Sequence, residues 1–368
     1  MYWHNGIISA NKKSKALVIM DKDLLRIIEK FNIEGKVKDI TPYGEGHINV
    51  TYLVTTDKKR YILQKINDYV FPDVEGLMQN ICGVTEHLKK KGSETLNIVK
   101  TKTGENYLKE GPYRVYEFNE NTTVYQTISD AKIFNRIGYA FGTFQRLLSD
   151  YDAKTLFEVI PGFHNTPERY RRFEQALKED VKGRAKTCEE EIKFVTDRKN
   201  TLSKVVDGLK DGSIPLRITH NDTKINNILI DADTGEARAI IDLDTIMPGS
   251  LLYDFGDSIR FGAATGREDE KDLNKISLSI ELFKAYSEGF CSALKGTITE
   301  KEKELLPYSA YLITIELVIR FLTDYLMGDV YFKINYEDHN LVRLRTQIKL
   351  VEEIEKHFGE MEKIIENI

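Results

Sequence analysis

The first third of the chain carries the alternating apolar pattern of short strands. Within 47–55, every second residue from Ile48 to Val54 is apolar, as a half-buried strand requires. Similar apolar runs predict further strands at 36–43, 60–66, 96–101 and 113–118. The polar residues 56–59, which separate the second and third strands, predict a hairpin turn.

Helical spacing of apolar residues dominates the rest of the chain. A short amphipathic helix begins near Leu24, and a longer one is predicted at 71–91, ending before Gly92 as helices often do. Further helices are predicted at 130–148, 189–208, 277–293, 305–328 and 341–366. Short strand-like runs interrupt them at 216–219, 228–230 and 239–243.

This order of elements predicts an α+β protein with two lobes of unequal size. We expect a small, β-rich N-terminal lobe over 1–118, of which 1–20 form a loose leader, and a larger, mainly helical C-terminal lobe over 119–368. A ligand site is expected in the cleft between two such lobes.

The composition of the chain is that of a globular protein and adds limits on its partners. The 368 residues carry a net charge of −5 with both signs mixed, which weighs against nucleic acid or an anionic membrane as a partner. The three cysteines have no CxxC spacing and are expected to be reduced thiols. With no export signal recognised in the leader, we expect a cytoplasmic protein. No obligate protein partner is expected.

The strongest chemical signal is the segment 220–227, His-Asn-Asp-Thr-Lys-Ile-Asn-Asn, between two short apolar strands. Phosphoryl transfer from ATP needs a carboxylate that accepts the acceptor's proton and an oxygen ligand for the metal on the phosphates. Asp222 offers the base, and Asn227 offers the metal ligand.

A second signal is the apolar run that leads into Asp242 and Asp244. On a strand these two side chains would share a face, and two carboxylates aimed together favour a bound cation. Because all the candidate ligands are oxygens, Mg²⁺ is the expected ion. Each motif alone also suits a solvated loop or strand end, but the two together predict an ATP-dependent phosphotransferase.

A third signal is the pair Gly44 and Gly46, which allows main-chain N–H groups to approach nucleotide phosphates but equally suits a plain hairpin. His47 follows them and is either a ligand contact or a structural residue. A strand follows this loop and a third glycine is missing, so a dinucleotide site is not predicted; the sequence also lacks a Walker A motif. Asp254 is predicted to be an N-cap or a brace for the catalytic loop.

The order of these motifs resembles the aminoglycoside phosphotransferase and choline kinase superfamily, whose fold is the two-lobed, protein-kinase-like fold. The runs 43–67, 216–263 and 320–332 resemble more closely the N-acetylhexosamine 1-kinases of that superfamily, and the likeness extends from about Phe31 to near the C-terminus.

This resemblance implies a reaction in which ATP phosphorylates the anomeric C1 hydroxyl of N-acetylglucosamine or N-acetylgalactosamine, giving the α-1-phosphate and ADP. It implies that Asp222 is the base, that Asn227 and Asp242 hold Mg²⁺, and that Asp244 can serve a second metal. The implied sugar contacts are Asp222, His47, Arg320 and Tyr331. The alternative is equally open that Arg320 is only a helix-surface residue and Tyr331 only a helix-end residue, without a role in sugar binding.

The third strand departs from the superfamily pattern. Many members carry a phosphate-binding lysine there, whereas this chain has Gln64, and Lys65 should face the other way. Either residue is expected to contact the nucleotide.

Alternative functions are a kinase of the same fold for choline, homoserine, methylthioribose or an aminoglycoside, a metal-dependent hydrolase, and a silent binding protein.

Overall fold

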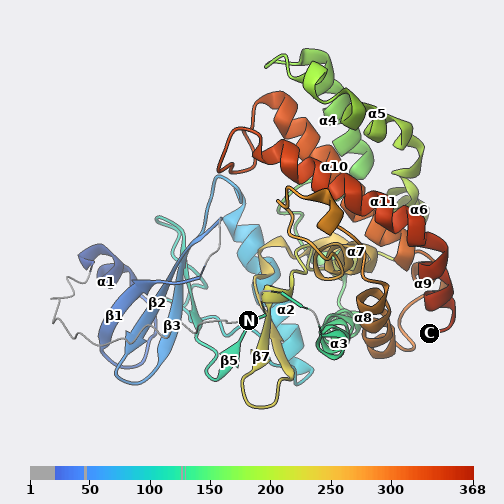
Figure 1. The fold of residues 1–368 in the computed structure, drawn as a ribbon. Coiled ribbons are helices and arrows are strands. Elements are labelled where there is room, and N and C mark those ends of the chain that lie inside the picture. The colour runs from blue at the N-terminus through green and yellow to red at the C-terminus, as the bar shows by residue number, and fades with distance from the viewer. Residues whose placement is uncertain (1–20, 45–47, 126, 129) are drawn as a thin grey trace, which may run out of the picture. The chain divides into compact units, whose positions relative to one another are not determined.

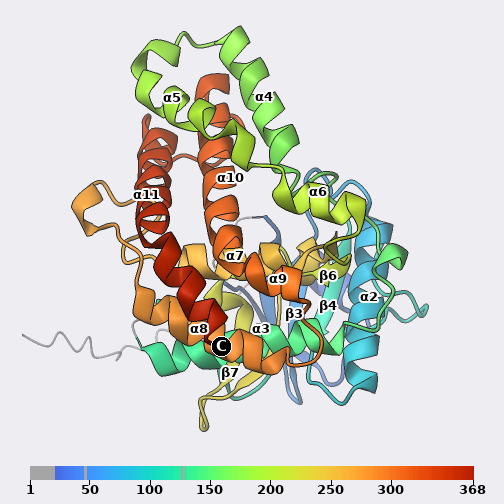
Figure 2. The ribbon, with the colours of Figure 1, turned by 90° about the vertical axis from the view of Figure 1, so that its right-hand side faces the viewer.

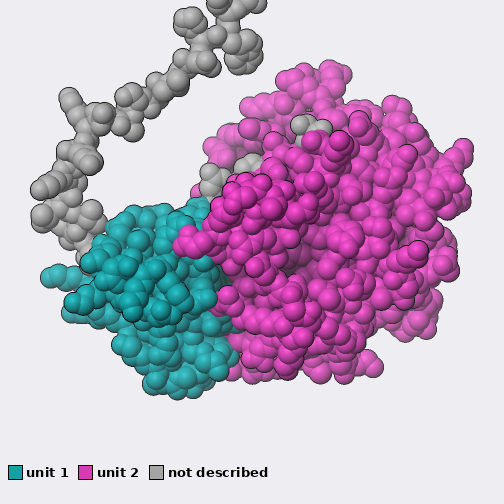
Figure 3. All heavy atoms as spheres, turned by 90° about the horizontal axis from the view of Figure 1, so that it is seen from below, with its two compact units in different colours: residues 1–67, 98–118 teal, residues 68–97, 119–368 magenta. Residues whose placement is uncertain are grey.

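The structure is a computed structural model that describes residues 21–44, 48–125, 127–128 and 130–368. The described chain forms two compact units (Figure 3). One contains the described residues up to Asn67 together with Ile98–Phe118, and the other contains Asp68–Asn97 together with Asn119–Ile368. Residues 68–97, which are predicted to belong to the first lobe, therefore group with the second unit.

The helix of this reassigned segment, α2 (Val74–Lys90), is anchored by hydrogen bonds within the second unit. The Asn80 side-chain amide donates to the main-chain oxygens of Phe157, at 2.8 Å, and Ile246, at 2.9 Å. It also accepts from the Phe157 main-chain N–H at 2.8 Å. Since Asn80 is buried, these bonds satisfy its whole amide group.

The first unit is built on a four-stranded antiparallel sheet in the order β1-β2-β3-β4 (Figure 1). Its strands are β1 (Val37–Pro42), β2 (Val50–Thr56), β3 (Arg60–Lys65) and β4 (Tyr113–Glu117). The predicted hairpin is confirmed, because the Thr56 hydroxyl accepts the N–H groups of Lys58 and Lys59 at 3.1 and 2.9 Å. The predicted strand 96–101 makes only isolated bridges.

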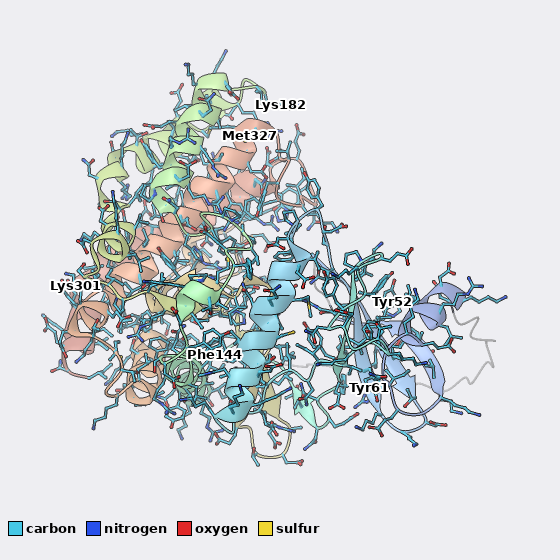
Figure 4. All side chains as sticks on the ribbon, turned by 180° about the vertical axis from the view of Figure 1, so that it is seen from behind. Tyr52, Tyr61, Phe144, Lys182, Lys301 and Met327 are labelled. Carbon is cyan, nitrogen blue, oxygen red and sulfur yellow. The ribbon has the colours of Figure 1, made fainter. Side chains whose placement is uncertain are left out.

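One face of this sheet packs on helix α1 (Lys22–Ile28). Tyr61 and Leu63 of β3 are buried in this core, and Tyr52 of β2 packs against it (Figure 4). The core residues are Leu24, Ile28, Phe31, Val54, Tyr61, Leu63, Val99 and Val115. Apolar burial on this side leaves the other sheet face to more polar side chains.

The second unit is mainly helical (Figures 1 and 2). Besides α2, its helices are α3 (Ala131–Leu147), α4 (Thr166–Glu179), α5 (Glu189–Asp197), α6 (Lys204–Asp211), α7 (Leu251–Gly262), α8 (Ile280–Ala293), α9 (Glu300–Glu304), α10 (Leu306–Met327) and α11 (His339–Glu366). The predicted helix 189–208 is wrong as one element, since a 3₁₀ turn at Lys199–Thr201 separates α5 from α6. None of the helices described in the structure is long and apolar enough to cross a membrane.

Helices α3 and α8 approach closely because glycines face each other between them. A side-chain carbon on Gly138 or Gly142 of α3 would collide with main-chain oxygens of α8, and one on Gly289 of α8 would collide with that of Asn135. Glycine in a helix interior costs roughly 1 kcal/mol of stability relative to alanine. The close approach of the two helices explains why glycine nevertheless occupies these positions. It also places the end of α3, with Phe144 (Figure 4), beside the segment 220–227.

Two small antiparallel sheets frame that segment. Strand β6 (Arg217–Thr219) pairs with β9 (Met247–Gly249), and β7 (Ile228–Asp231) pairs with both β8 (Ala237–Ile240) and β5 (Thr122–Thr123). The segment 220–227 follows β6 and leads directly into β7, while β8 ends just before Asp242. The two motifs predicted from the sequence are thus attached to the same hairpin.

Candidate active site

Asp222 is held in place by two other residues of its own loop. The Asn227 side-chain amide donates to the Asp222 main-chain oxygen at 2.9 Å and to its carboxylate at 3.2 Å. The Lys224 ammonium nitrogen lies 2.9 Å from one carboxylate oxygen and 3.1 Å from the other. The Asp222 side chain remains 25% exposed, which leaves the carboxylate open to a ligand.

His220 connects this loop to the segment that carries Asp242. Its buried ring packs edge-on against Phe141 and Phe144, with centroids 6.0 and 6.2 Å away. The Asp222 main-chain N–H donates to Nδ1 at 3.3 Å, and Nε2 lies 2.9 Å from the Ile241 oxygen. Because the first partner can only donate and the second can only accept, the pairing assigns the proton to Nε2.

Three further hydrogen bonds join the same two segments. The Thr245 hydroxyl donates to the His220 oxygen at 2.6 Å, and the Asn221 side chain donates to the Thr245 oxygen at 2.7 Å. The Ile241 N–H donates to the Asn227 oxygen at 2.9 Å. The loop of Asp222 and the approach to Asp242 are therefore one hydrogen-bonded structure.

Asp242 and Asp244 do not lie on a strand, so the prediction that they share a strand face is wrong. Strand β8 ends at Ile240, and Asp242 adopts the left-handed conformation with φ of 58° before the 3₁₀ turn Leu243–Thr245. Asp242 is exposed, whereas Asp244 is only 4% exposed. A left-handed backbone is unfavourable for most residues but is tolerated by Asp and Asn.

Lys224 lies in the electrostatic field of several carboxylates. Burial lowers the pKa of its ammonium group, but Asp222, Asp257 and Asp242 oppose this effect and raise the pKa above its usual value. The lysine therefore stays charged, and its pKa reflects the proximity of Asp242 as well as Asp222. Sequence reasoning missed Lys224 as a site residue, although it stands within the strongest motif.

Asp254 of α7 supports the main chain of the loop 220–227, which is one of the two roles predicted for it. Its fully buried carboxylate accepts the main-chain N–H groups of His220, at 3.0 Å, and Asn221, at 2.8 Å, and the Gln145 amide at 2.6 Å. Burial raises the pKa of this carboxyl, and the three donors oppose that rise. The N-cap of α7 is Ser250 instead.

Asp257, one turn later on α7, supports the loop with a charge pair. Its carboxylate accepts the Thr223 N–H at 3.1 Å and two bonds from Arg260 at 2.8 and 3.1 Å. Burial favours the neutral acid, but the Arg260 guanidinium outweighs it and lowers the pKa of the Asp257 carboxyl. Both carboxylates of α7 thus hold main-chain N–H groups of the loop.

Arg320 and Tyr331, two of the implied sugar contacts, lie together on α10 and the loop after it. An Arg320 guanidinium nitrogen lies 3.5 Å from the Tyr331 hydroxyl. The guanidinium carbon lies 5.7 Å from the centre of the Tyr331 ring and 5.5 and 5.4 Å from those of Phe163 and Phe332. Such cation–aromatic contacts hold the arginine while Tyr331 remains 65% exposed.

A buried histidine–glutamate pair beside Arg320 was not recognised in the sequence. Glu316 accepts hydrogen bonds from the His164 ring at 2.9 Å and the Thr166 hydroxyl at 2.7 Å. Burial raises the pKa of Glu316, yet His164 and Arg320 outweigh it and leave the pKa lowered. Because His164 and Glu316 are 152 positions apart, no local pattern connects them.

The loop that carries Tyr331 is fixed by the buried carboxylate of Asp324. This group accepts the main-chain N–H groups of Val330, Tyr331 and Phe332 at 2.9, 2.7 and 2.9 Å. It also accepts the Asn340 amide of α11 at 2.8 Å. The carboxylate replaces the main-chain partners that an irregular loop lacks.

Replacing Asp324 by alanine should release this loop. Loss of the charge-assisted bonds is expected to speed hydrogen exchange at the amides of 330–332 by roughly 10-fold or more, as measured by mass spectrometry. Asp338→Ala is the matched control, because Asp338 is exposed and its side chain does not cap α11. Equal exchange in the two variants would contradict the role given to Asp324.

The residues expected to contact the nucleotide belong to the first unit. Gly44 has a positive φ of 76°, which suits glycine, whereas Gly46 and His47 lie outside the described residues. Gln64 donates to the Thr51 hydroxyl at 3.0 Å and accepts from the buried Arg114 at 3.0 Å. Lys65 is exposed. Their contacts with a nucleotide stay a prediction.

Solved structures with the same fold are phosphotransferases. An aminoglycoside phosphotransferase from Alicyclobacillus acidocaldarius has a TM-score of 0.63 and 13% identity, over 94% of this chain and 96% of that one. A microcompartment-associated aminopropanol kinase has a TM-score of 0.62 and 14% identity, over 93% and 99%. A choline kinase from Cryptosporidium parvum Iowa II has a TM-score of 0.58 and 13% identity, over 94% and 99%.

These similarities confirm the expected kinase-like fold, with a small antiparallel sheet and a larger helical region. The sequence model of the phosphotransferase enzyme family matches residues 39–287. This span includes Asp222, Asn227, Asp242 and Asp254. This span is more than half of the chain. The chain therefore belongs to the phosphotransferase enzyme family.

Proposed function

We propose that this protein is an ATP-dependent kinase that phosphorylates the anomeric C1 hydroxyl of N-acetylglucosamine or N-acetylgalactosamine. Membership of the phosphotransferase family supports the reaction class. A spectinomycin phosphotransferase of the same fold, with a TM-score of 0.56, is known in complex with ADP, which supports ATP as the donor. The observation that carries the proposal is the partly exposed Asp222 carboxylate, held by Asn227 and Lys224.

The residues around Asp222 fit a magnesium ion. Because the Asn227 amide nitrogen donates to Asp222, its side-chain oxygen is the atom left for a metal. Asp242 adds an exposed carboxylate on the connected segment. Mg²⁺ needs only one or two protein carboxylates, with phosphates and water as further ligands. Accordingly, no cluster of three acidic, histidine or cysteine side chains with metal-holding geometry occurs in the described parts of the chain.

When bound, Mg²⁺ would neutralise charge on the ATP phosphates. Asp222 would orient the acceptor hydroxyl and take its proton, and the main-chain bonds to Asp254 would keep the loop in place. Lys224 would fix the carboxylate and add positive charge near the transferred group. His47, Arg320 and Tyr331 are the proposed sugar contacts, and Asp244 is a proposed position for a second metal.

A panel of acceptors tests the proposal. The protein is incubated with ATP and Mg²⁺ and with N-acetylglucosamine, N-acetylgalactosamine, glucose, choline, homoserine, methylthioribose or an aminoglycoside. We expect a phosphorus NMR signal coupled to the anomeric proton of the N-acetylhexosamines and an equal amount of ADP. Phosphorylation of another acceptor alone would replace the sugar assignment. Phosphate release from a phosphoester without nucleotide would favour a hydrolase.

Removal of the Lys224 charge should slow transfer rather than weaken binding. Lys224→Met is expected to lower kcat roughly 10- to 100-fold, because the ammonium group acts on charge that grows in the transition state. KM for ATP should change less, as steady-state kinetics would show. Lys210→Met, on the exposed side of α6, is the control. An unchanged kcat for Lys224→Met would exclude this role.

A further inference from the structure

The carboxylate of Glu316 joins helix α10 to the segment 163–166, which leads into α4. One of its oxygens accepts from the His164 ring at 2.9 Å, and the other accepts from the Thr166 hydroxyl at 2.7 Å. The His164 and Glu316 side chains are only 7% and 2% exposed, and Thr166 is fully buried. Helices α4 and α10 pack side by side (Figure 2), so these two bonds hold the segment against α10.

Phe163, at the start of this segment, supports the guanidinium group of Arg320. The guanidinium carbon lies 5.5 Å from the centre of the Phe163 ring. The main-chain oxygen of Phe163 accepts two hydrogen bonds from Arg169 of α4, at 3.3 and 2.9 Å. Because Glu316 fixes the segment on α10, it also fixes the aromatic surface that Arg320 contacts.

Glu316 supplies a negative charge that acts on both arginines. Burial raises the pKa of its carboxyl, but His164 and Arg320 outweigh burial and lower the pKa, so the group is ionised. Burial and the charge of Arg320 lower the pKa of Arg169, and the charge of Glu316 opposes this effect. The two guanidinium groups therefore repel each other, and the carboxylate offsets their repulsion.

The contacts of Glu316 leave the Arg320 guanidinium open to a ligand. Both carboxylate oxygens already accept hydrogen bonds from the segment 163–166. Among the residues that the structure describes, the only hydrogen-bond acceptor of this guanidinium is the Tyr331 hydroxyl, at 3.5 Å. A guanidinium carries several N–H donors, so the remaining ones are available to an acceptor oxygen of a ligand.

We propose that Glu316 is a positioning residue that holds Arg320 in the orientation in which it binds the acceptor sugar. His164 and Thr166 orient the carboxylate, and its charge keeps Arg320 in place without occupying the guanidinium donors. The sugar-binding part rests on the proposed function, in which Arg320 contacts the sugar. Loss of Glu316 should therefore weaken sugar binding rather than slow the step at Asp222.

Glu316→Gln tests this role, because the amide keeps the shape and the oxygen that accepts from Thr166 but removes the charge. KM for the N-acetylhexosamine is expected to rise roughly tenfold, whereas kcat and KM for ATP should change less than about twofold. Glu352→Gln, at an exposed position on α11, is the matched control and should keep all three constants. An unchanged KM for the sugar in Glu316→Gln overturns the proposal.

A second variant decides if Glu316→Gln does not fold, as judged by circular dichroism. Thr166→Val keeps the shape of the side chain but removes one of the two donors to the carboxylate. It is expected to raise KM for the sugar roughly threefold, with kcat nearly unchanged. A sugar KM equal to that of the unaltered protein would refute the orienting role of this segment.

A double-mutant cycle with Arg320→Ala separates positioning from a general effect on the structure. Glu316→Gln should raise KM for the sugar roughly tenfold in the unaltered protein but less than about twofold in the Arg320→Ala protein. Equal factors in the two proteins would show that Glu316 acts through the fold as a whole, and they would refute its action through Arg320.

Chemical labelling separates this inference from the proposed function, since it needs no turnover. Phenylglyoxal modification of Arg320, followed by mass spectrometry of peptides, should be at least about threefold faster in Glu316→Gln than in the unaltered protein. Arg171, exposed on α4, is the internal control and should react equally in both. Equal rates at Arg320 overturn the positioning role. If no acceptor is phosphorylated, the proposed function fails, whereas the labelling rate still decides whether Glu316 holds Arg320.

Discussion

Asp222→Asn is expected to lower kcat by roughly 10²-fold or more, with little change in ATP binding. The amide keeps the shape of the carboxylate but cannot accept the proton of the acceptor hydroxyl. It also turns a donor or a weaker acceptor toward Lys224, which lies 2.9 Å from the present carboxylate. Release of ADP, measured with the acceptor that the panel identifies, gives kcat and KM, and calorimetry gives the affinity for ATP.

The control for this change is Asp233→Asn, in the exposed turn between β7 and β8. Its turnover should match that of the unaltered protein. Near-normal turnover of Asp222→Asn would exclude Asp222 as the base. A loss of ATP affinity equal to the loss of kcat would instead indicate that the carboxylate acts mainly in binding.

Asp254→Ala is expected to lower the free energy of unfolding by about 3–5 kcal/mol. The fully buried carboxylate accepts three N–H donors, from His220, Asn221 and Gln145. Alanine would leave the two main-chain N–H groups without a partner, and the Gln145 amide would keep only its bond to the Ile218 oxygen. Urea unfolding, followed by circular dichroism, measures the change through the transition midpoint and slope. Activity should fall with stability, since the loop of Asp222 loses its support.

Two comparisons distinguish this brace from an ordinary acidic residue. Asp197→Ala removes an exposed side chain paired with Lys193 and should cost less than about 1 kcal/mol. Asp254→Asn retains one acceptor and should lie between the two. If Asp254→Ala and Asp197→Ala shift the midpoint equally, the bracing role is refuted.

The long helices and the order of the motifs could be predicted because both depend on the spacing of residues that are close in the sequence. The predicted helix 305–328 corresponds to α10 at Leu306–Met327, and that at 130–148 corresponds to α3 at Ala131–Leu147. Amphipathic periodicity extends over many turns in such segments. The break between α5 and α6 was missed because Lys199–Thr201 contains neither glycine nor proline.

The parts of the site that were missed depend on a single backbone angle or on distant residues. The left-handed conformation of Asp242, which follows the end of β8 and differs from the predicted strand, follows from no repeating pattern. The pair of His164 and Glu316 joins positions 152 residues apart, and Asp254 contacts a loop more than 30 residues before it. Such contacts arise only when the chain has folded, so spacing in the sequence cannot reveal them.

The close packing of α3 on α8 at Gly138, Gly142 and Gly289 has a consequence for mutational screens. A methyl group at Gly142 would push the helices apart, and Phe144 and Gln145 follow two and three residues later on α3. Both of those side chains contact the loop that carries Asp222 through His220 or Asp254. Searches for inactive variants should therefore recover substitutions at Gly138 and Gly142, positions whose importance comes from helix spacing.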